Sequence, residues 1–164
     1  MEEIDLYNKR INLKYRAPFW DFKLEFDFSR DMFEDEKCEV MIRFEKVRKK
    51  LKIKYCEFNK LFQKLANINY CQVIITSGAW GRDGSDLDIY LEYASNCLSV
   101  HIWAHECEIE TRGLTEINNI FNEILEMFDI DKEKLFNYNY DNLIKNKNDI
   151  EKSIKNIKKS KYFA

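Results

Sequence analysis

The alternation of apolar and polar residues between Tyr70 and Glu106 constrains the fold more than any other feature of this chain. Successive side chains of a β-strand point to opposite faces, so a period of two predicts strands with one apolar and one polar face. It predicts three consecutive strands, Tyr70 to Trp80, Ser85 to Tyr93 and Leu98 to Glu106. The turn sequence Gly81-Arg82-Asp83-Gly84 separates the first two, so we expect an antiparallel meander.

The polar face of this meander carries the candidate functional residues. Trp, Tyr and Arg side chains anchor many protein–protein interfaces, and carboxylates steer basic partners toward them. An ordinary solvated sheet face is the alternative interpretation. If the face binds a partner, the predicted partner-binding residues are Trp80, Arg82, Asp83, Asp86, Asp88, Tyr90, Glu92 and Trp103.

Alternation also predicts strands earlier in the chain. Pro18 opens a run that extends to Phe28, in which Trp, Phe and Leu face one way and Asp, Lys and Glu face the other. Residues 38–45 and 50–55 alternate in the same manner. Residues 37–55 also fit a helix, because apolar residues recur at helical spacing with acids near one end and bases near the other. We favour strands there, and the helix stays open.

Two helices are predicted from apolar residues three and four positions apart, at about residues 56–67 and 114–128. A weaker apolar stripe follows, from Leu143 to Ile157. The order βββαβββα indicates an α+β fold: a mainly antiparallel sheet of about six strands, helices packed on one face, and a C-terminal helical tail. The predicted parts are an N-terminal segment at 1–17, the α+β domain at 18–129 and a Lys-rich helical tail at 130–164 that packs on the domain.

Charge and cysteine content narrow the class of protein. The net charge of −2 implies no bulk attraction to nucleic acid or membrane, and the lysines from Lys145 to Lys161 leave the rest of the chain acidic. The five cysteines are odd in number and include no Cys-x-x-Cys pair, which favours free thiols in the reducing cytosol. The sequence has no secretion signal and no apolar run of about 20 residues. We therefore predict a cytoplasmic protein that binds no membrane, nucleic acid or cofactor.

The segment Ser85-Asp86-Leu87-Asp88 resembles the nucleotidyltransferase signature, in which Ser-Asp-x-Asp opens a strand after a glycine turn. Residues i and i+2 of a strand share a face, so Asp86 and Asp88 could hold the divalent metals that carry a nucleoside triphosphate. Gly78 lies only eight residues before Asp86, too few for the helix that the family places between them. The candidate third carboxylate is Glu106. A reduced nucleotidyltransferase is therefore the alternative function.

The third predicted strand also carries His101, His105 and Cys107, which would share a face with Trp103. His and Cys are ligands of transition metals. Four residues of strand span about 13 Å, however, which is too far for both histidines to bind one ion. We therefore predict no metal site, and expect these side chains to face solvent or a partner.

The order of elements resembles that of small bacterial immunity proteins of the WapI type, the cytosolic antidotes to wall-associated or contact-delivered toxins. The resemblance runs from about Phe19 to Phe128. It rests on the alternating strands, the helix around Phe58-Asn59-Lys60-Leu61-Phe62-Gln63-Lys64-Leu65, the meander through Val73-Ile74-Ile75, Leu87-Asp88-Ile89-Tyr90-Leu91 and Val100-His101-Ile102-Trp103, and a helix from Leu114. It implies a non-enzymatic protein that binds a cognate toxin, expected to be basic, and blocks its active site. Such families share no catalytic residues, so none are carried over.

Overall fold

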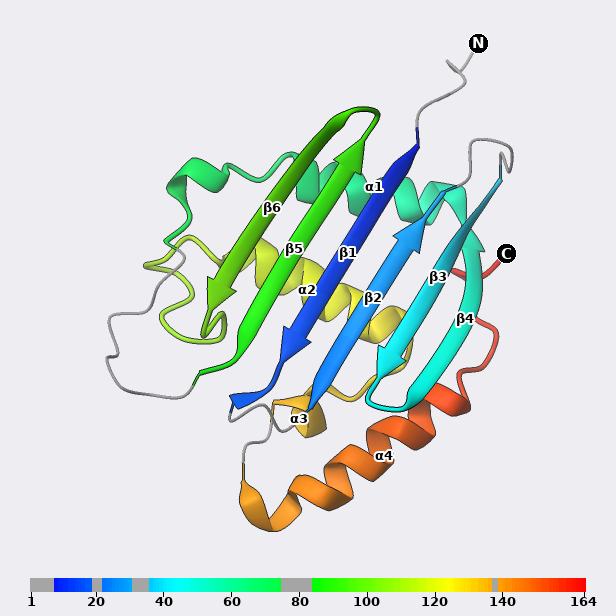
Figure 1. Cartoon of the computed structure of the whole chain (residues 1–164), viewed down its shortest axis with the longest axis vertical. Helices are drawn as coiled ribbons and strands as arrows, with labels where there is room; N and C mark the ends of the chain where they lie inside the picture. The colour runs from blue at the N-terminus through cyan, green and yellow to red at the C-terminus, as the bar shows by residue number, and fades with distance from the viewer. Residues whose placement is uncertain (1–7, 19–21, 31–35, 75–83, 137–138) are drawn as a thin grey trace.

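The computed structural model describes residues 8–18, 22–30, 36–74, 84–136 and 139–164 (Figure 1). Six strands form one sheet in the order β4-β3-β2-β1-β5-β6, and every neighbouring pair is antiparallel. The predicted α+β class with a mainly antiparallel sheet is therefore confirmed. The strands are β1 (Lys9–Arg16), β2 (Lys23–Ser29), β3 (Lys37–Phe44), β4 (Val47–Lys54), β5 (Asp86–Tyr93) and β6 (Asn96–Trp103).

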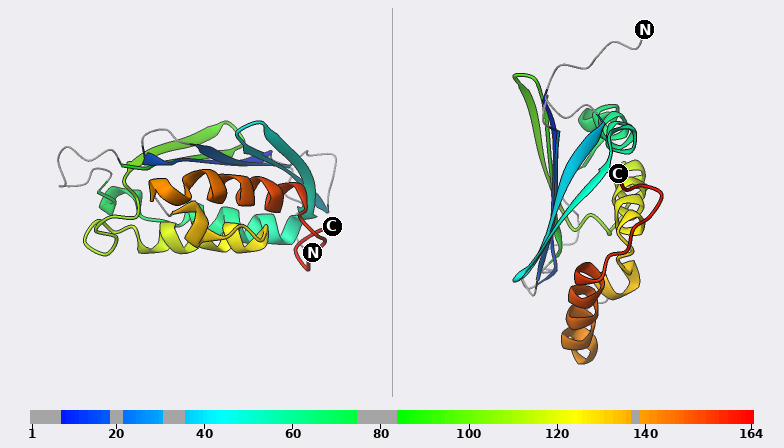
Figure 2. Two further views of the ribbon diagram at one scale, coloured as in Figure 1. Left: turned by 90° about the horizontal axis from the view of Figure 1, so that it is seen from below. Right: turned by 90° about the vertical axis from the view of Figure 1, so that its right-hand side faces the viewer.

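The described helices all lie on one face of the sheet, which makes a two-layer fold (Figure 2). Amphipathic sequence explains the two central helices, since each buries its apolar stripe against the sheet. The predictions for residues 56–67 and 114–128 are confirmed within a residue or two. The helical elements are α1 (Tyr55–Ala66), the 3-10 turn η2 (Tyr70–Gln72), α2 (Thr115–Met127), α3 (Lys132–Leu135), the 3-10 turn η3 (Tyr140–Asn142) and α4 (Leu143–Lys155).

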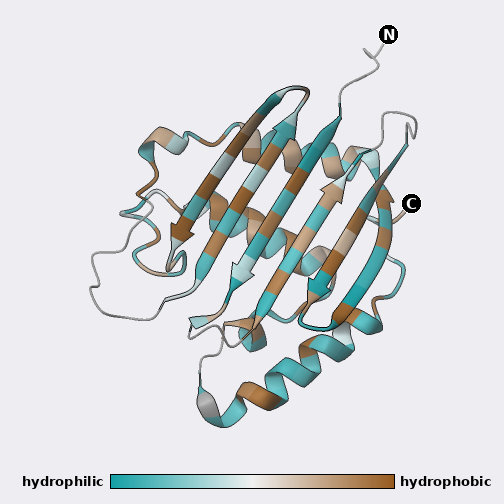
Figure 3. Cartoon of the chain, in the orientation of Figure 1, coloured by the Kyte–Doolittle hydropathy of each residue, from teal (hydrophilic) through white to brown (hydrophobic). Residues whose placement is uncertain are grey.

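The core lies between the two layers and is rich in aromatic rings. Figure 3 shows hydrophobic and hydrophilic residues alternating along the strands, as a sheet with one buried face requires. Phe26 and Phe28 of β2 point toward the helices, where each contacts the ring of Phe128, and Phe28 also stacks on Phe58 of α1. The sheet and both helices therefore share one hydrophobic core.

Residues 37–54 form the β3–β4 hairpin, so the strand interpretation of this stretch is confirmed, and Tyr55 is the first residue of α1. Val40, Ile42 and Phe44 are all fully buried on the helix side, and a strand puts them there together because its period is two. The connecting turn is shorter than expected and falls at residues 45–46, where Glu45 takes a φ of +52°. Local hydrophobic alternation outweighs the charges that would suit a helix dipole.

Strand β1 is the main element that was not predicted from the sequence. The predicted N-terminal segment of residues 1–17 contains it, and it lies inside the sheet between β2 and β5. Its alternation is obscured at the start by Lys9, whose side chain points into the core side and is 6% exposed. The Lys9 ammonium donates to Asn59 Oδ1 at 3.0 Å and lies 5.3 Å from the Phe62 ring centroid, which compensates its burial.

The strand predicted from Tyr70 to Trp80 is corrected in part. Tyr70–Gln72 is the 3-10 turn η2, Val73 and Ile74 are not in a strand, and residues 75–80 lie outside the described residues. The predicted neighbour of residues 85–93 is also different, because β5 pairs with β1 and β6. A strand has only two edges, so β1 occupies the place that the first strand of the meander would have taken.

The C-terminal part of the chain packs on the domain at the β4 side of the sheet. Ile150 and Ile154 of α4 are buried. Beyond the helix, Phe163 forms a β-bridge with Ile53, the N–H of Lys54 donates to Tyr162 O at 2.9 Å, and the N–H of Ala164 donates to Lys52 O at 3.1 Å. The last residues therefore cover part of the outer edge of β4.

Candidate functional site

The face of the sheet opposite the helices is open, since no described helix lies on it (Figure 2). Its side chains are mostly charged, and the dominant sign changes from strand to strand. The face of β5 is acidic, the neighbouring β1 carries Arg10, Lys14 and Arg16, and β2 and β3 carry both signs. The far edge strand, β4, presents Arg48, Lys50, Lys52 and Lys54, all exposed. At the other end of the sheet lies a group that we call the acidic strip, formed by Asp86, Asp88, Tyr90 and Glu92 of β5 with His101 and Trp103 of β6.

The predicted orientation of β5 is confirmed. Leu87, Ile89 and Leu91 are at most 5% exposed, whereas the four residues between and beside them reach the open face. His101 and Trp103 stand on the same face because β6 pairs with β5 in register, with Asp88 opposite His101 and Asp86 opposite Trp103. The structure thus brings together five of the eight residues predicted to bind a partner. The other three, Trp80, Arg82 and Asp83, lie outside the described residues.

Asp86 and Asp88 are held between two cationic or potentially cationic side chains. Arg16 of β1 lies 3.3 Å from Asp86 Oδ2 and 3.8 Å from Asp88 Oδ2. From the other side, His101 Nε2 lies 3.3 Å from Asp86 Oδ1, and His101 Nδ1 contacts Asp88 Oδ1. Cross-strand pairs of opposite charge stabilise neighbouring strands, so this arrangement fixes both carboxylates in place.

The same contacts bear on metal binding by the two aspartates. Their side chains do share a face, as the nucleotidyltransferase resemblance requires, but a divalent cation would have to displace Arg16 from between them. Glu106 accepts a hydrogen bond from buried Ser85 and lies beside His105, so it does not join the pair. Within the described residues, no group of three or more His, Cys, Asp or Glu side chains has the geometry to hold a metal ion.

The other end of the acidic strip is ordered by a hydrogen bond and a cation–π contact. The Tyr90 hydroxyl donates to Glu92 Oε2 at 3.1 Å, and this hydrogen bond raises the pKa of Tyr90. The Arg10 guanidinium lies 5.9 Å from the Tyr90 ring centroid and donates two hydrogen bonds of 2.9 Å to Asp27 on β2. Arg10 thereby links the strip to the centre of the sheet.

Arg10 and Arg16 are the site residues that sequence reasoning missed. Both belong to β1, and the alternation Arg10-Ile11-Asn12-Leu13-Lys14-Tyr15-Arg16 is present in the sequence, so this signal could have located the strand. Its pairing with β5 is a contact between distant segments, and local periodicity does not specify such a neighbour.

The predicted position of His105 on the polar face is wrong. It does not stand beside His101, because β6 ends at Trp103 and Ala104 takes a left-handed φ of +48°. The change of direction turns His105 into the core, where it is fully buried. Its ring makes edge contacts with Tyr15, Phe121 and Phe136 at centroid distances of 5.5–5.7 Å.

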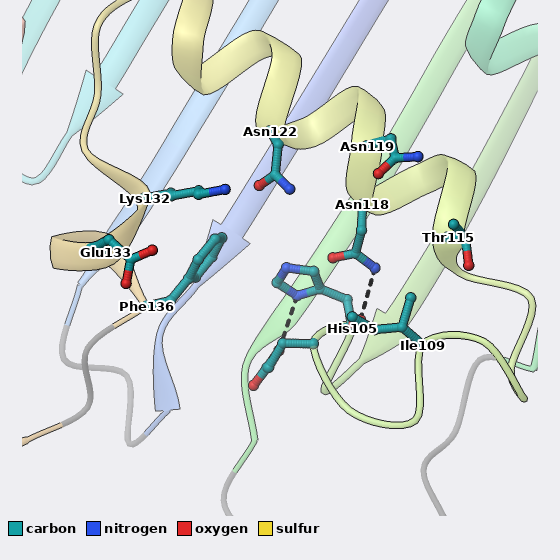
Figure 4. A pocket seen from close by; sticks show the side chains of 10 residues that line it. His105, Ile109, Thr115, Asn118, Asn119, Asn122, Lys132, Glu133 and Phe136 are labelled. Atoms are coloured by element: carbon teal, nitrogen blue, oxygen red, sulfur yellow. Dashed lines mark hydrogen bonds and ion pairs between the residues drawn. The ribbon is translucent and has the colours of Figure 1, made fainter.

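His105 also forms part of the wall of a pocket of about 510 Å³ between α2 and α3 (Figure 4). Figure 4 shows Asn118, Asn119 and Asn122 of α2 on one side of the imidazole and Lys132, Glu133 and Phe136 on the other. Burial lowers the pKa of His105 to about 4, so the ring is neutral at pH 7. Ser85 Oγ donates to Glu106 and lies 3.3 Å from His105 Nδ1, which assigns the ring proton to Nδ1.

A serine beside a histidine and a carboxylate raises the question of nucleophilic catalysis. Ser85 is fully buried and does not line the pocket, and its hydroxyl proton is already donated to Glu106. Deprotonated Nε2 of His105 is buried with no hydrogen-bond partner among the described residues. The three groups form a buried polar cluster with no access for a substrate to the serine oxygen, so we assign them a structural role.

Comparisons with protein-family models, with curated proteins and with solved structures find no match to this chain. Within the described residues, no helix is both long enough and apolar enough to cross a membrane. All five cysteines are free thiols in the structure: Cys38 is buried, Cys107 is half-buried, and Cys56, Cys71 and Cys97 are exposed.

Proposed function

We propose that this chain is a non-enzymatic cytosolic protein that binds a basic protein partner through the acidic strip. The proposed partner is a cognate bacterial toxin whose active site is blocked in the complex, as in the immunity proteins that the order of elements predicted from the sequence resembles. The observation that carries the proposal is the acidic strip itself, in which carboxylates and aromatic rings of β5 and β6 lie together on the open face.

The charges of the open face favour docking at its β5–β6 side. A basic partner is attracted to the carboxylates of the acidic strip, whereas the basic side chains of β1 and β4 repel it from the rest of the face. Complementary charge raises association rates and excludes wrong partners more than it raises affinity. The aromatic rings of Tyr90 and Trp103 then supply the apolar contact that anchors such interfaces.

The side chains of the strip are ordered before any partner binds. Asp86 and Asp88 are held by Arg16 and His101, and Tyr90 is held by Glu92. Ordering side chains at an interface costs free energy, so contacts that already exist in the free protein reduce that cost. Asp86 is 15% exposed and Asp88 35%, which leaves the outer carboxylate the more accessible of the two.

A reduced nucleotidyltransferase stays the alternative because Asp86 and Asp88 share one face of β5. Titration with Mg²⁺ and a nucleoside triphosphate separates the two functions. The alternative predicts saturable nucleotide binding that requires Mg²⁺ and is lost in the Asp86→Ala, Asp88→Ala double variant. The binding function predicts no such affinity.

The direct experiment is a titration of the purified chain with any secreted toxin that is encoded beside its gene. The proposal expects a stable one-to-one complex whose formation abolishes the activity of the toxin, and whose association rate falls as salt is added. A chain with no affinity for any neighbouring toxin would contradict the proposed function.

A further inference from the structure

The two edges of the sheet are protected very differently. Exposed edge strands carry unpaired N–H and C=O groups and pair readily with other strands, and natural proteins guard them with charges, especially Lys, or with covering segments. Edge strand β4 has both devices, since its sequence is VRKKLKIK and residues 162–164 bond to its backbone. Edge strand β6 has the sequence NCLSVHIW, with no Lys, Arg, Asp, Glu or Pro. Among the described residues, the devices that prevent strand pairing are therefore found on β4 and not on β6.

The hydrogen bonds identify which groups of β6 face outward. The N–H of Ala104 donates to Ser85 O, so residues 104 and 85 are a hydrogen-bonded pair of the β5–β6 ladder. Such pairs alternate in an antiparallel ladder, so the even-numbered residues of β6 bond to β5 and the odd-numbered ones point their N–H and C=O away. The C=O of Trp103 follows this alternation, since it points away from β5 and accepts a hydrogen bond from Arg112. The outward groups of Cys97, Ser99 and His101 pair with no strand in the part of the chain that the structure describes.

We propose that β6 pairs with β6 of a second copy of this chain, antiparallel and centred on Ser99. This two-fold register places Ser99 opposite Ser99 of the second copy and Cys97 opposite His101 of the second copy. It is the register that uses the outward N–H and C=O groups of all three residues, because Ser99 is their midpoint. The two sheets then join into one continuous antiparallel sheet.

The side chains of β6 are complementary to themselves in this register. On the helix face, Leu98 of one copy meets Val100 of the other, and each is only partly buried in the single chain. Ile74, 51% exposed, lies at the same edge, since its N–H donates to Arg112 O and Arg112 bonds the end of β6. No charged pair is brought together across the axis, whereas β4 against β4 would oppose basic residues.

The dimer does not depend on the proposed function, but it would enlarge the surface that the proposed function uses. Pairing through β6 puts the acidic strips of two copies side by side at the centre of the joined sheet, with the basic β4 edges at its two ends. A failure of toxin binding would leave the dimer intact, and a monomeric protein would leave the acidic strip available. The two claims are therefore tested separately.

The first test measures the mass of the full chain in solution by light scattering and sedimentation over a wide concentration range. We expect a concentration-dependent dimer, of twice the 19.9 kDa of the chain. Ser99→Lys puts a like charge on both sides of the axis and should raise the dissociation constant at least tenfold. The matched control Ser29→Lys makes the same change at an exposed position of the open face on interior strand β2, and should leave the dissociation constant within twofold.

The second test reads the register by cysteine cross-linking, in a background with Cys56, Cys71 and Cys97 replaced by serine. In a hydrogen-bonded antiparallel pair, opposed Cα atoms lie about 5.5 Å apart, which a disulfide can span. Ser99→Cys should therefore form a disulfide-linked dimer at least tenfold faster than His101→Cys. Equal rates for the two variants, or a monomer at every concentration, would overturn the proposal, as would slow amide exchange of Ser99 in a monomer.

Discussion

Gly84 lies against the indole ring of Trp103, so closely that a Cβ atom at position 84 would stand 2.9 Å from Cε2 and Cζ2 of that ring. It would also stand 3.0 Å from the Cβ of Ala104. Close approach is what requires glycine here, since the described glycine with a positive φ is Gly113. The sequence Gly81-Arg82-Asp83-Gly84 predicts a tight turn, and the structure adds that Gly84 sets the position of an aromatic residue of the acidic strip.

Gly84→Ala should therefore displace the Trp103 indole. We expect a loss of roughly 1–3 kcal/mol in the free energy of unfolding, because overpacking forces side chains from their preferred positions. The measurement is chemical denaturation, with Trp103 fluorescence followed in a background where Trp20 and Trp80 are phenylalanine. In a double-mutant cycle, Trp103→Phe should relieve much of the cost of Gly84→Ala. Strictly additive effects would show that the two residues are not coupled.

Burial of neutral His105 makes stability depend on pH. The pKa of His105 is lowered from 6.5 to about 4, so between these values the unfolded chain binds a proton that the folded chain does not. Stability is thus full above pH 6.5 and falls as the pH drops toward 4, by roughly 2–3 kcal/mol from this group. The measurement is the free energy of unfolding in urea across this range.

The second histidine supplies the control for that prediction. His105→Gln should remove the part of the pH dependence that arises between pH 4 and 6.5, whatever its effect on overall stability. His101→Gln, on the open face and 55% exposed, should retain the contribution of His105. A wild-type slope that survives in His105→Gln would assign the pH dependence to other groups.

Arg112 holds the segment after β6 in place and should tolerate no substitution. Its guanidinium donates to the backbone oxygens of Ile74, Trp103, Ala104 and Cys107 at 2.6–3.0 Å, and the residue is 2% exposed. Arg112→Lys keeps the charge but cannot reach four carbonyls with one ammonium group, so we expect a loss of about 2–4 kcal/mol. Exposed Arg48→Lys is the matched control, and should change the free energy of unfolding by less than about 0.5 kcal/mol. Equal effects in thermal or chemical unfolding would contradict this role.

The elements that could be predicted from sequence are those whose period is unbroken. β2, β3, β5 and most of β6 follow from alternation, and α1 and α2 from helical spacing, because in each the side chains of one face are apolar. β1 was not predicted, because its first residue, Lys9, is a charged residue on the core side. Residues 70–74 carry apolar side chains, yet they form a 3-10 turn and a connection, since β1 already pairs with β5.

For the candidate surface, the orientation of the side chains could be predicted from the sequence, but their contacts could not. The outward direction of Asp86, Asp88, Tyr90 and Glu92 follows from the period of β5 alone. The contacts that hold them depend on Arg10 and Arg16, which are distant in sequence and become neighbours only through strand pairing. The position of His105 could not follow from alternation, because the left-handed φ of Ala104 ends the period one residue earlier.

The most direct test of the acidic strip as a binding surface is the dissociation constant of the toxin complex in two charge-reversed variants. Asp88→Lys and Glu39→Lys make the same change on the same open face, and the two carboxylates are similarly exposed, at 35% and 37%. Only Asp88 belongs to the strip. We predict that Asp88→Lys weakens the complex at least tenfold, equivalent to about 1.4 kcal/mol, and that Glu39→Lys stays within twofold of wild type. Equal dissociation constants for the two variants would contradict the account.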